Sequence, residues 1–301
     1  MNRRLHILAL AGLLLLTGCD NDDFVAPSFL HVDAIKLVPP TTGAITMESG
    51  FYTSDIVAAY VVAYYSNPGR LDTLGLFRTP FTIPVLHDGP VEYLEFFPAV
   101  EQSGMSRTLP FYTFYHSIRV SDTALHSGDT LVFDTLTTTY NLTRNDVLMY
   151  EMFEPTEGSL LFDSVMQWRP QAPDEACSGR GYGYVPVADS EYTVQFDIDH
   201  DFIVTDATKL LYLELDTRSD VEFRVYMQSS YRVGGAPVRE SVMAIRPSTE
   251  WKHIYVNLGR TWTTFNHNPQ FRISFSTVNT DGVEGEVRLD NVRLLTTNVA
   301  L

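Results

Sequence analysis

The segment from residue 211 to residue 227 reads LYLELDTRSDVEFRVYM. Leucine occupies every second position from 211 to 215, and apolar residues return with the same period from Val221 to Met227. A two-residue period places the apolar side chains on one face of an extended strand and the polar ones on the other. The segment therefore predicts two neighbouring β-strands, each with one buried and one solvated face.

Much of the chain has the same character. Alternation recurs in residues 192–199, 254–258 and 271–275, and short β-rich runs separated by turns occupy 29–37, 56–65, 71–77, 91–97, 111–120 and 130–139. No long segment has a helical period, and residues 205–211 could hold one short helical turn at most. Strands with one wet face belong to antiparallel sheets, and two such sheets stack on their apolar faces. The fold class that we predict is all-β, with two β-sandwich domains.

We place the boundary between the two predicted domains near residues 143–147. The first sandwich then covers residues 29–145 and the second covers residues 146–301. Residues 169–190 are rich in Pro and Gly, so we expect a long loop near the start of the second sandwich. Loops at the ends of such sandwiches are common ligand sites.

The N-terminus predicts export. Residues 1–18 combine two arginines, a short apolar run and small residues, which is typical of a signal peptide and too short for a membrane span. The tetrapeptide at 16–19, Leu-Thr-Gly-Cys, resembles the lipobox of bacterial lipoproteins. That resemblance implies that Cys19 carries acyl chains, which anchor a protein in a membrane. The tether at 19–28, with its acidic Asp20–Asp23, resembles the export signal of Bacteroidetes lipoproteins, which implies an outer-membrane location facing the cell exterior.

The charge excludes one class of partner. The chain has 21 basic and 37 acidic residues, and removal of residues 1–18 with their two arginines leaves 21 − 2 = 19 basic residues and a net charge near −18. Such a surface repels phosphate backbones, so we expect no nucleic-acid partner. It also disfavours docking on anionic lipid, so the acyl anchor would have to hold the protein at the membrane.

Motifs for catalysis are absent from the sequence. It contains no CxxC, HExxH or Gly-x-Ser-x-Gly pattern and no Gly-rich phosphate loop. Cys177 is left alone once Cys19 is acylated. Asp197, Asp199 and Asp201 alternate on one predicted strand face, and we interpret them as its wet side rather than as the carboxylate pair of a glycosidase. We therefore predict a protein that is not an enzyme.

Three stretches of the second domain resemble carbohydrate-binding-module-like jelly rolls. They are residues 151–154, EMFE, residues 251–258, WKHIYVNL, and residues 289–294, LDNVRL. The likeness covers about residues 146–298. The first domain, in its turn at 67–69 and its Phe-rich part at 81–97, resembles the immunoglobulin-like domain that precedes such modules in Bacteroidetes lipoproteins.

The resemblance implies a metal site. In such jelly rolls an early acidic residue and the Asp of the last strand often share a structural Ca²⁺, and Glu154 and Asp290 stand at these positions. Calcium needs six or more oxygen ligands. A strand-end hydrogen-bonding role for Asp290 is the alternative.

Aromatic residues in or beside the predicted loops are the ligand-binding candidates, because sugar rings stack on exposed aromatic faces. They are Trp168, Tyr182, Tyr184, Tyr231 and Trp262. We expect Trp251, in contrast, to lie in the core. The predicted function is a non-catalytic outer-membrane lipoprotein that binds a glycan at the cell surface. The alternative is a structural or protein-interaction subunit of a cell-surface complex, which predicts a contiguous exposed apolar patch.

Overall fold

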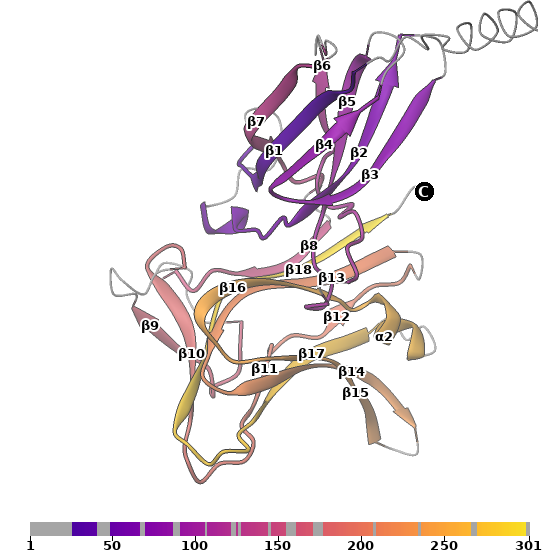
Figure 1. Ribbon diagram of the computed structural model, residues 1–301. Helices are drawn as coiled ribbons and strands as arrows, with labels where there is room; N and C mark the ends of the chain where they lie inside the picture. Colours follow the sequence, from indigo (N-terminus) through magenta and orange to yellow (C-terminus); the bar gives the residue numbers. More distant parts are fainter. Residues whose placement is uncertain are drawn as a thin grey trace, which may run out of the picture.

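The computed structural model describes most of the chain after the N-terminal segment: residues 26–40, 49–66, 70–86, 91–105, 107–121, 125, 128–143, 146–154, 161–170, 177–206, 209–233, 236–265 and 270–298. Strands dominate it, and the predicted all-β sandwich class is confirmed (Figure 1). Among the named strands, β1–β7 pair only with one another and β8–β18 pair only with one another. We call the first group the N-terminal sandwich and the second group the C-terminal sandwich.

The N-terminal sandwich has two sheets. One has the order β4-β1-β7 and consists of β1 (Ser28–Leu37), β4 (Phe81–Val85) and β7 (Thr130–Thr138). The other has the order β3-β2-β5-β6 and consists of β2 (Ala58–Tyr65), β3 (Leu71–Arg78), β5 (Val91–Ala99) and β6 (Ile118–Ser121). A short 3₁₀ helix, η1 (Ser49–Tyr52), lies between β1 and β2.

One pairing in this sandwich could not be expected from strand patterns. Strands β1 and β7 run parallel, with Leu30 opposite Leu131 and Leu37 opposite Thr138. About a hundred residues separate these partners in the chain. Periodicity shows which face of a strand is apolar, but it does not show which strand lies beside it.

The C-terminal sandwich also has two sheets. Its six-stranded sheet has the order β16-β13-β18-β10-β9, and β8 also pairs with β18; the strands are β8 (Val147–Glu151), β9 (Gln167–Pro170), β10 (Gly181–Val187), β13 (Lys209–Ser219), β16 (Ser248–Asn257) and β18 (Gly285–Asn298). Its five-stranded sheet has the order β11-β17-β14-β15, and β12 also pairs with β17; the strands are β11 (Gln195–Asp197), β12 (Phe202–Ile203), β14 (Glu222–Val233), β15 (Ala236–Ile245) and β17 (Gln270–Val278). A short helix, α2 (Gly259–Thr264), follows β16.

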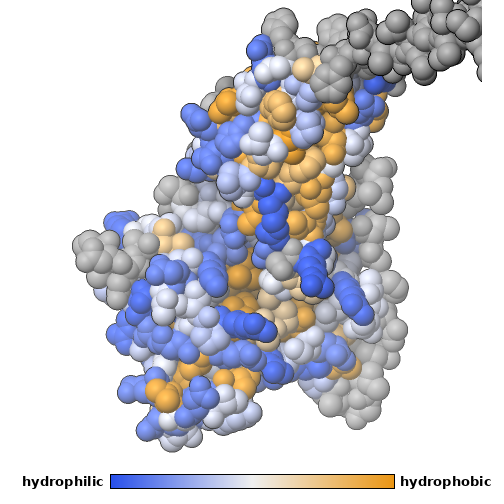
Figure 2. Space-filling model, viewed as in Figure 1, coloured by the Kyte–Doolittle hydropathy of each residue, from blue (hydrophilic) through white to orange (hydrophobic). Residues whose placement is uncertain are grey.

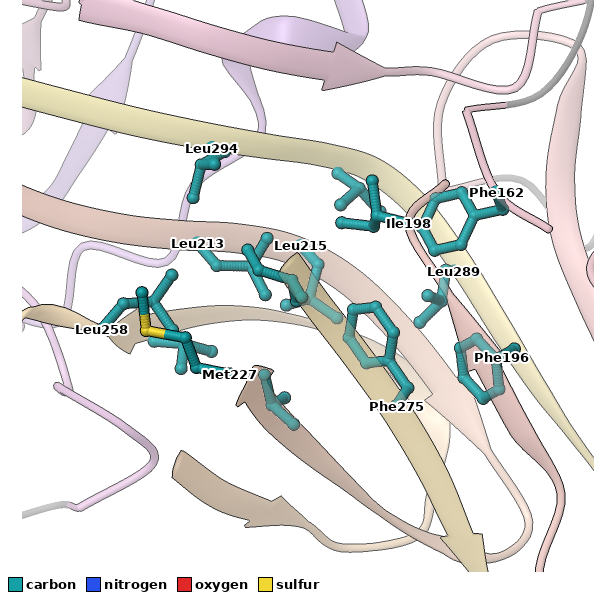
Figure 3. Close-up of a cluster of buried hydrophobic side chains, with 14 of the residues drawn as sticks. Phe162, Phe196, Ile198, Leu213, Leu215, Met227, Leu258, Phe275, Leu289 and Leu294 are labelled. Carbon is teal, nitrogen blue, oxygen red and sulfur yellow. The ribbon is translucent and has the colours of Figure 1, made fainter. Parts of the chain in front are cut away.

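The core of the C-terminal sandwich lies between its two sheets. Leu213 and Leu215 from β13 and Leu289 from β18 face Met227 from β14 and Phe275 from β17 (Figure 3). All five side chains are fully buried. The prediction made from the alternation at residues 211–227 is therefore confirmed, because its apolar positions fill this core.

The N-terminal sandwich is seated on the outer face of the six-stranded sheet (Figure 1). Tyr212, Tyr255 and Leu295 from that face belong to the buried cluster of the N-terminal sandwich. The ring of Tyr112 packs edge to face on Tyr212 and Tyr255, with centroids 5.2 and 5.0 Å apart. In Figure 2 apolar residues gather over β2, β3 and β4 and continue down into this junction.

Several local predictions need correction. Residues 111–120 are not one strand, because β6 begins only at Ile118 and turns precede it. Residues 169–190 are not one loop, because β9 ends at Pro170 and β10 occupies Gly181–Val187. The alternation at 192–199 yields only the short β11.

The segment that carries the predicted signal peptide, the Cys19 anchor and most of the tether lies outside the described residues. Within the residues that the structure does describe, none of the helices has the length and apolar character needed to cross a bilayer.

Candidate functional site: the outer face of the six-stranded sheet

The outer face of the six-stranded sheet carries both the junction with the N-terminal sandwich and a row of aromatic side chains. On β16, Ile254 and Val256 contribute to the core, so Trp251, His253 and Tyr255 lie on the opposite, outer face. This face has a closed half under the N-terminal sandwich and an open half over β9, β10 and the first part of β18.

A bulge in β18 arranges the polar side chains of this face. Asp290 pairs with Asp216, whereas Arg293 pairs with Glu214, so β18 has one more residue than β13 over this step. Asn291, at the extra position, has φ of 49°, a left-handed conformation that Asn tolerates better than most residues. The bulge resets the alternation so that Asp290 and Arg293 reach the same face.

In the closed half, Glu214 is a buried carboxylate that joins the two sandwiches. Its Oε2 lies 2.8 Å from Arg293 Nε, and it accepts hydrogen bonds from the hydroxyls of Tyr112 and Tyr140, at 2.5 and 2.6 Å. Arg293 in turn donates to the backbone carbonyls of Phe51 and Thr53. The C-terminal sandwich thus supplies a buried ion pair whose remaining hydrogen bonds come from the N-terminal sandwich.

His253 lies beside this ion pair. Its Nδ1 is 2.7 Å from Asp216 Oδ1, and its Nε2 is 3.6 Å from Glu214 Oε2. Burial lowers the pKa of His253, but the charge of Asp216 and the hydrogen bonds to Asp216 and Glu214 together outweigh burial, so the net direction is upward. Burial raises the pKa of Glu214, but the Arg293 guanidinium, His253 and the Tyr112 hydroxyl together outweigh burial and hold that pKa below its usual value. We call Glu214, Asp216, His253 and Arg293, with Tyr112 and Tyr140, the junction network.

The open half carries the aromatic row, which we define as Trp251, Tyr182 and Tyr184. The rings of Trp251 and Tyr182 meet edge to face with centroids 6.2 Å apart. Trp251 and Tyr184 are half-buried, whereas Tyr182 is buried beneath its neighbours. Trp251 and Tyr184 are therefore the members whose rings can meet a ligand, and Tyr182 supports them.

Charged side chains are interleaved with the aromatic row. The guanidinium of Arg288 lies 5.1 Å from the ring centre of Tyr182, and that of Arg169 lies 4.9 Å from the ring centre of Tyr184. Glu286 pairs with Arg288 and accepts a hydrogen bond from the Tyr184 hydroxyl. Burial and the Glu286 carboxylate both raise the pKa of Tyr184, so its hydroxyl stays protonated at neutral pH. The row offers both hydrogen-bond donors and acceptors beside ring faces.

The register sets the extent of this surface. Tyr184 lies opposite Arg288, and Arg288 lies opposite Arg218, so one line of side chains crosses β10, β18 and β13 towards Trp251 on β16. The backbones of β10 and β16 lie three strand spacings, about 14 Å, apart. The Trp251 side chain reaches across this distance, because its ring centre lies 6.2 Å from that of Tyr182.

Trp251 also lines a pocket at the junction, which we call the junction pocket. The cavity measures about 550 Å³ and has Trp251, Lys252 and His253 on one side and Lys36, Tyr52 and Asp55 on the other. Its volume lies in the range of small-molecule sites. The aromatic row therefore continues into a hollow whose walls come from both sandwiches.

The structure places the predicted ligand-binding residues on different strands and on different faces of the sheet. Tyr182 and Tyr184 lie in the strand β10 rather than in a loop. Trp168 lies in the neighbouring β9, is 38% exposed, and donates its indole N–H to the carbonyl of Phe153 at 2.6 Å. Its register partner is Gly183, so it points to the opposite side of the sheet from Tyr184.

Trp262 and Tyr231 lie in regular secondary structure rather than in loops. The expectation that Trp262 is exposed is wrong: it lies in α2, is 2% exposed and belongs to the core. Tyr231 has its backbone in β14 rather than in a loop, and its side chain lies outside the described part of the chain. Trp262 therefore does not contribute to the aromatic row.

Trp251 is a functional candidate whose position was predicted wrongly from the sequence. We expected it in the core, but it is half-buried on the outer face and lines the junction pocket. A signal for this was present. Trp251 has the same parity as His253 and Tyr255 and the opposite parity to Ile254 and Val256, which are the inward-facing residues of β16.

Glu154 and Asp290, the predicted calcium ligands, lie on two sides of the turn at residues 177–180. Glu154 accepts a hydrogen bond from Arg180 N at 2.8 Å and pairs with its guanidinium, whereas Asp290 accepts hydrogen bonds from Ser178 N and Asn291 N. In the described part of the chain, no three His, Cys, Asp or Glu side chains are placed to hold a metal ion. Calcium also binds backbone and amide carbonyls, so the calcium site at Glu154 and Asp290 stays a prediction.

The environment of Asp290 is nevertheless unusual. Its side chain is fully buried, and burial together with the nearby Asp216 raises its pKa to about 8. Cys177 lies beside the same group, 3.8 Å from Asn291 Nδ2, and burial raises the pKa of its thiol. A thiol held in its neutral form is a poor nucleophile.

The acidic segment at residues 197–201 forms ion pairs with Arg272. Arg272 Nε lies 2.9 Å from Asp201 Oδ1, and Arg272 Nη1 lies 3.7 Å from Asp199 Oδ1. This group lies on the five-stranded sheet, away from the aromatic row. Asp199 and Asp201 are paired with Arg272, whereas Asp197 accepts hydrogen bonds from the amide of Gln195.

Comparison with known proteins gives distant structural likenesses. No protein-family model matches the sequence, and no curated protein matches it either. A family 29 carbohydrate-binding module bound to cellulohexaose aligns with 51% of this chain and 93% of its own, at 14% identity and a TM-score of 0.32. A family 30 carbohydrate-binding module aligns with 47% of this chain and 80% of its own, at 12% identity and a TM-score of 0.36.

The enzymatically active domain of tailspike protein 4 from bacteriophage CBA120 also aligns, at 12% identity and a TM-score of 0.32. The match covers 44% of this chain but only 18% of the tailspike domain. Likeness at this level does not carry a function from any of these proteins to this chain.

Proposed function

We propose that this chain is a non-catalytic, lipid-anchored protein that binds a glycan through the aromatic row. The observation that carries the proposal is the open half of the six-stranded sheet, where half-buried Trp251 and Tyr184 lie beside the Arg288–Glu286 pair of β18. Ring faces take up the apolar side of a sugar, and the charged groups bind its hydroxyls. The solved carbohydrate-binding modules with a distantly similar fold agree with this class of ligand.

The location of the protein is part of the proposal. Acylation of Cys19 would anchor the chain in the outer membrane, and the acidic tether would place both sandwiches outside the cell. The sequence of residues 1–23 supports this location. Metabolic labelling with a radioactive fatty acid tests it, because a Cys19→Ser variant should lose both the label and the membrane association.

The glycan proposal is tested with Trp251→Ala and Tyr184→Ala. Wild-type protein is screened on an array of neutral and acidic oligosaccharides, and the strongest ligand is then titrated by calorimetry. Truncation of a central aromatic contact should weaken binding about tenfold or more. Tyr192→Ala is the matched control, since Tyr192 is 63% exposed and lies outside the row.

The outcome separates the proposal from its alternatives. Binding that is unchanged in both row variants would place the ligand elsewhere. A wild-type protein that binds nothing on the array would remove the glycan proposal. Both variants must unfold at temperatures close to wild type for the comparison to hold.

A second candidate function has an observation of its own. The outer face of the sheet β4-β1-β7 exposes Phe29, Val132 and Leu86, with exposed fractions of 37%, 53% and 68%. Phe29 is in register with Pro84 of β4. An apolar patch on a sheet face suits a protein partner. Co-purification that depends on Phe29 and Val132 would favour an accessory subunit of a surface complex.

A further inference from the structure

A second pocket lies on the other side of the junction, around Phe111 in the N-terminal sandwich. It measures about 380 Å³, and its lining includes Phe97, Phe111, Thr113, His116, Ser117 and Asn141. Thr297, near the end of β18, also borders it. It shares no lining residue with the junction pocket, so the aromatic row and this pocket are separate. We call it the Phe111 pocket.

The Phe111 ring is open to a ligand. It is 50% exposed, although it is a large apolar side chain. It meets the rings of Tyr60 and Phe97 at interplanar angles of 87° and 64°, so neither covers it by parallel stacking. These two half-buried neighbours support the ring from the outer face of the four-stranded sheet.

Polar groups surround this ring. Among the residues that the structure describes, His116 and Asn141 are exposed and their side chains form no hydrogen bond. Asn141 offers an amide donor and an acceptor, and the imidazole of His116 offers one or both, depending on its protonation. A hydroxyl-rich ligand above Phe111 would find partners on both sides.

The walls of the pocket are fixed by backbone hydrogen bonds. Tyr112 N donates to Pro98 O at 2.7 Å, which holds the segment with Phe111 against β5. Asn141 N donates to Phe114 O at 2.7 Å, and His116 N donates to Thr139 O at 3.0 Å, which hold the opposite wall. A pocket held in this way is formed before a ligand arrives, as binding sites for small molecules usually are.

The charge of the pocket indicates the ligand. Its lining contains no carboxylate, lysine or arginine, and burial raises the pKa values of its two tyrosines, Tyr112 and Tyr115. The nearby Glu95 carboxylate already accepts a hydrogen bond from Ser117 at 2.7 Å. The pocket therefore suits a neutral ligand with one apolar face and several hydroxyls.

We propose that the Phe111 pocket is a second sugar-binding site, which takes a neutral pyranose ring stacked on Phe111 and hydrogen-bonded to Asn141 and His116. This site belongs to the N-terminal sandwich and lies across the junction from the aromatic row. It would give one chain two separate contacts with a surface glycan. Two linked contacts raise the apparent affinity for a multivalent glycan above that of either site.

The test uses the whole mature chain on an array of neutral oligosaccharides, with Phe111→Ala and Asn141→Ala as the site variants. Binding of neutral sugars to a protein that already carries Trp251→Ala isolates the second site. That residual binding should fall about tenfold or more when Phe111→Ala is added. Tyr192→Ala added to the same background should leave it unchanged.

The outcomes distinguish the two sites. Residual binding lost with Phe111→Ala or Asn141→Ala supports the second site, whatever happens at Trp251. No residual binding in Trp251→Ala, or residual binding that Phe111→Ala leaves intact, overturns the second site but leaves the proposed function in place. A Phe111→Ala change that alters only self-association in sedimentation overturns it as well, because the pocket would then bind protein. Thermal unfolding of each variant verifies the fold.

Discussion

The two halves of the outer face of the six-stranded sheet are built from the same strands but are covered differently. In the closed half, the junction network satisfies buried charges with hydroxyls and carbonyls of the N-terminal sandwich. In the open half, the charged groups of β9 and β18 support aromatic rings of β10 that no domain covers. A sheet face can therefore serve as a domain interface at one end and a ligand surface at the other. The difference lies in burial: the Glu214–Arg293 pair is fully buried under the N-terminal sandwich, whereas the Glu286–Arg288 pair is partly exposed.

The strongest test of the comparison removes one buried charge. Arg293→Met should destabilise the chain by about 3–5 kcal/mol, because it leaves Glu214 buried without its cation. The matched control is Arg272→Met, which removes a partly exposed ion pair and should change stability by about 0–1 kcal/mol. The free energy of unfolding in urea measures both. Equal small effects would show that the junction network does not hold the sandwiches together.

A gentler test removes single hydroxyls. Tyr140→Phe deletes a hydrogen bond to the buried Glu214 carboxylate and should destabilise the chain by about 1.5–3 kcal/mol. Tyr184→Phe deletes a hydrogen bond to Glu286 in the open half, where water can replace it, and should change stability by less than about 1 kcal/mol. The same chemical change thus probes both halves. Urea unfolding at neutral pH compares them, and a larger effect at Tyr184 would reverse the comparison.

Asp290, which lies between the two halves, should make the stability of the chain depend on pH. Asp290 has a pKa of about 8, so the folded chain holds a proton there that the unfolded chain has already lost. Stability should therefore fall as the pH rises towards 8, by on the order of 1 kcal/mol for each pH unit between about 6 and 8. The raised pKa of His253 acts in the same direction, because its stabilising charge is lost as the pH rises through the folded-state pKa.

Asp290→Asn separates the two contributions. It should flatten the pH dependence of the unfolding free energy, since an amide does not ionise, and leave only the part due to His253. The measurement is urea unfolding of both proteins at several pH values. An unchanged slope in the variant would assign the pH dependence to His253 alone.

The smallest effect is expected at the exposed edge of the open half. Arg169→Ala removes a guanidinium that covers the Tyr184 ring, and an exposed cation–π contact contributes about 0.5–1 kcal/mol. Stability should therefore change by no more than that amount in thermal or urea unfolding. A loss as large as that of Arg293→Met would mean that the open half is as structural as the closed one.

Local pattern predicted the strands and their faces, but not the partners across the sheets. The alternation at residues 211–227 correctly assigned Leu213, Leu215 and Phe223 to the core. The face of Trp251 could be predicted from its parity with His253, but the aromatic character of the residue favoured the core. The prediction for Trp262 was wrong because its polar neighbours suggested an exposed loop, whereas the residue lies in α2 with its side chain buried.

The junction network could not be predicted from the sequence. Glu214 meets Tyr112 and Tyr140 across 102 and 74 residues, and such contacts depend on how whole domains pack. The bulge at Asn291 depends on the register of β18 against β13, which no single-strand pattern contains. Tyr182 and Tyr184 were recognised by residue type, but the structure was needed to show that they share a face with Trp251.

The most direct test of the account is a crystal structure of the chain with the oligosaccharide that binds it most strongly on the array. The account predicts a sugar ring over Trp251 and a second contact near Tyr184, on the open half of the six-stranded sheet. A sugar bound only to the five-stranded sheet or only to the Phe111 pocket, with the aromatic row left bare, would contradict it.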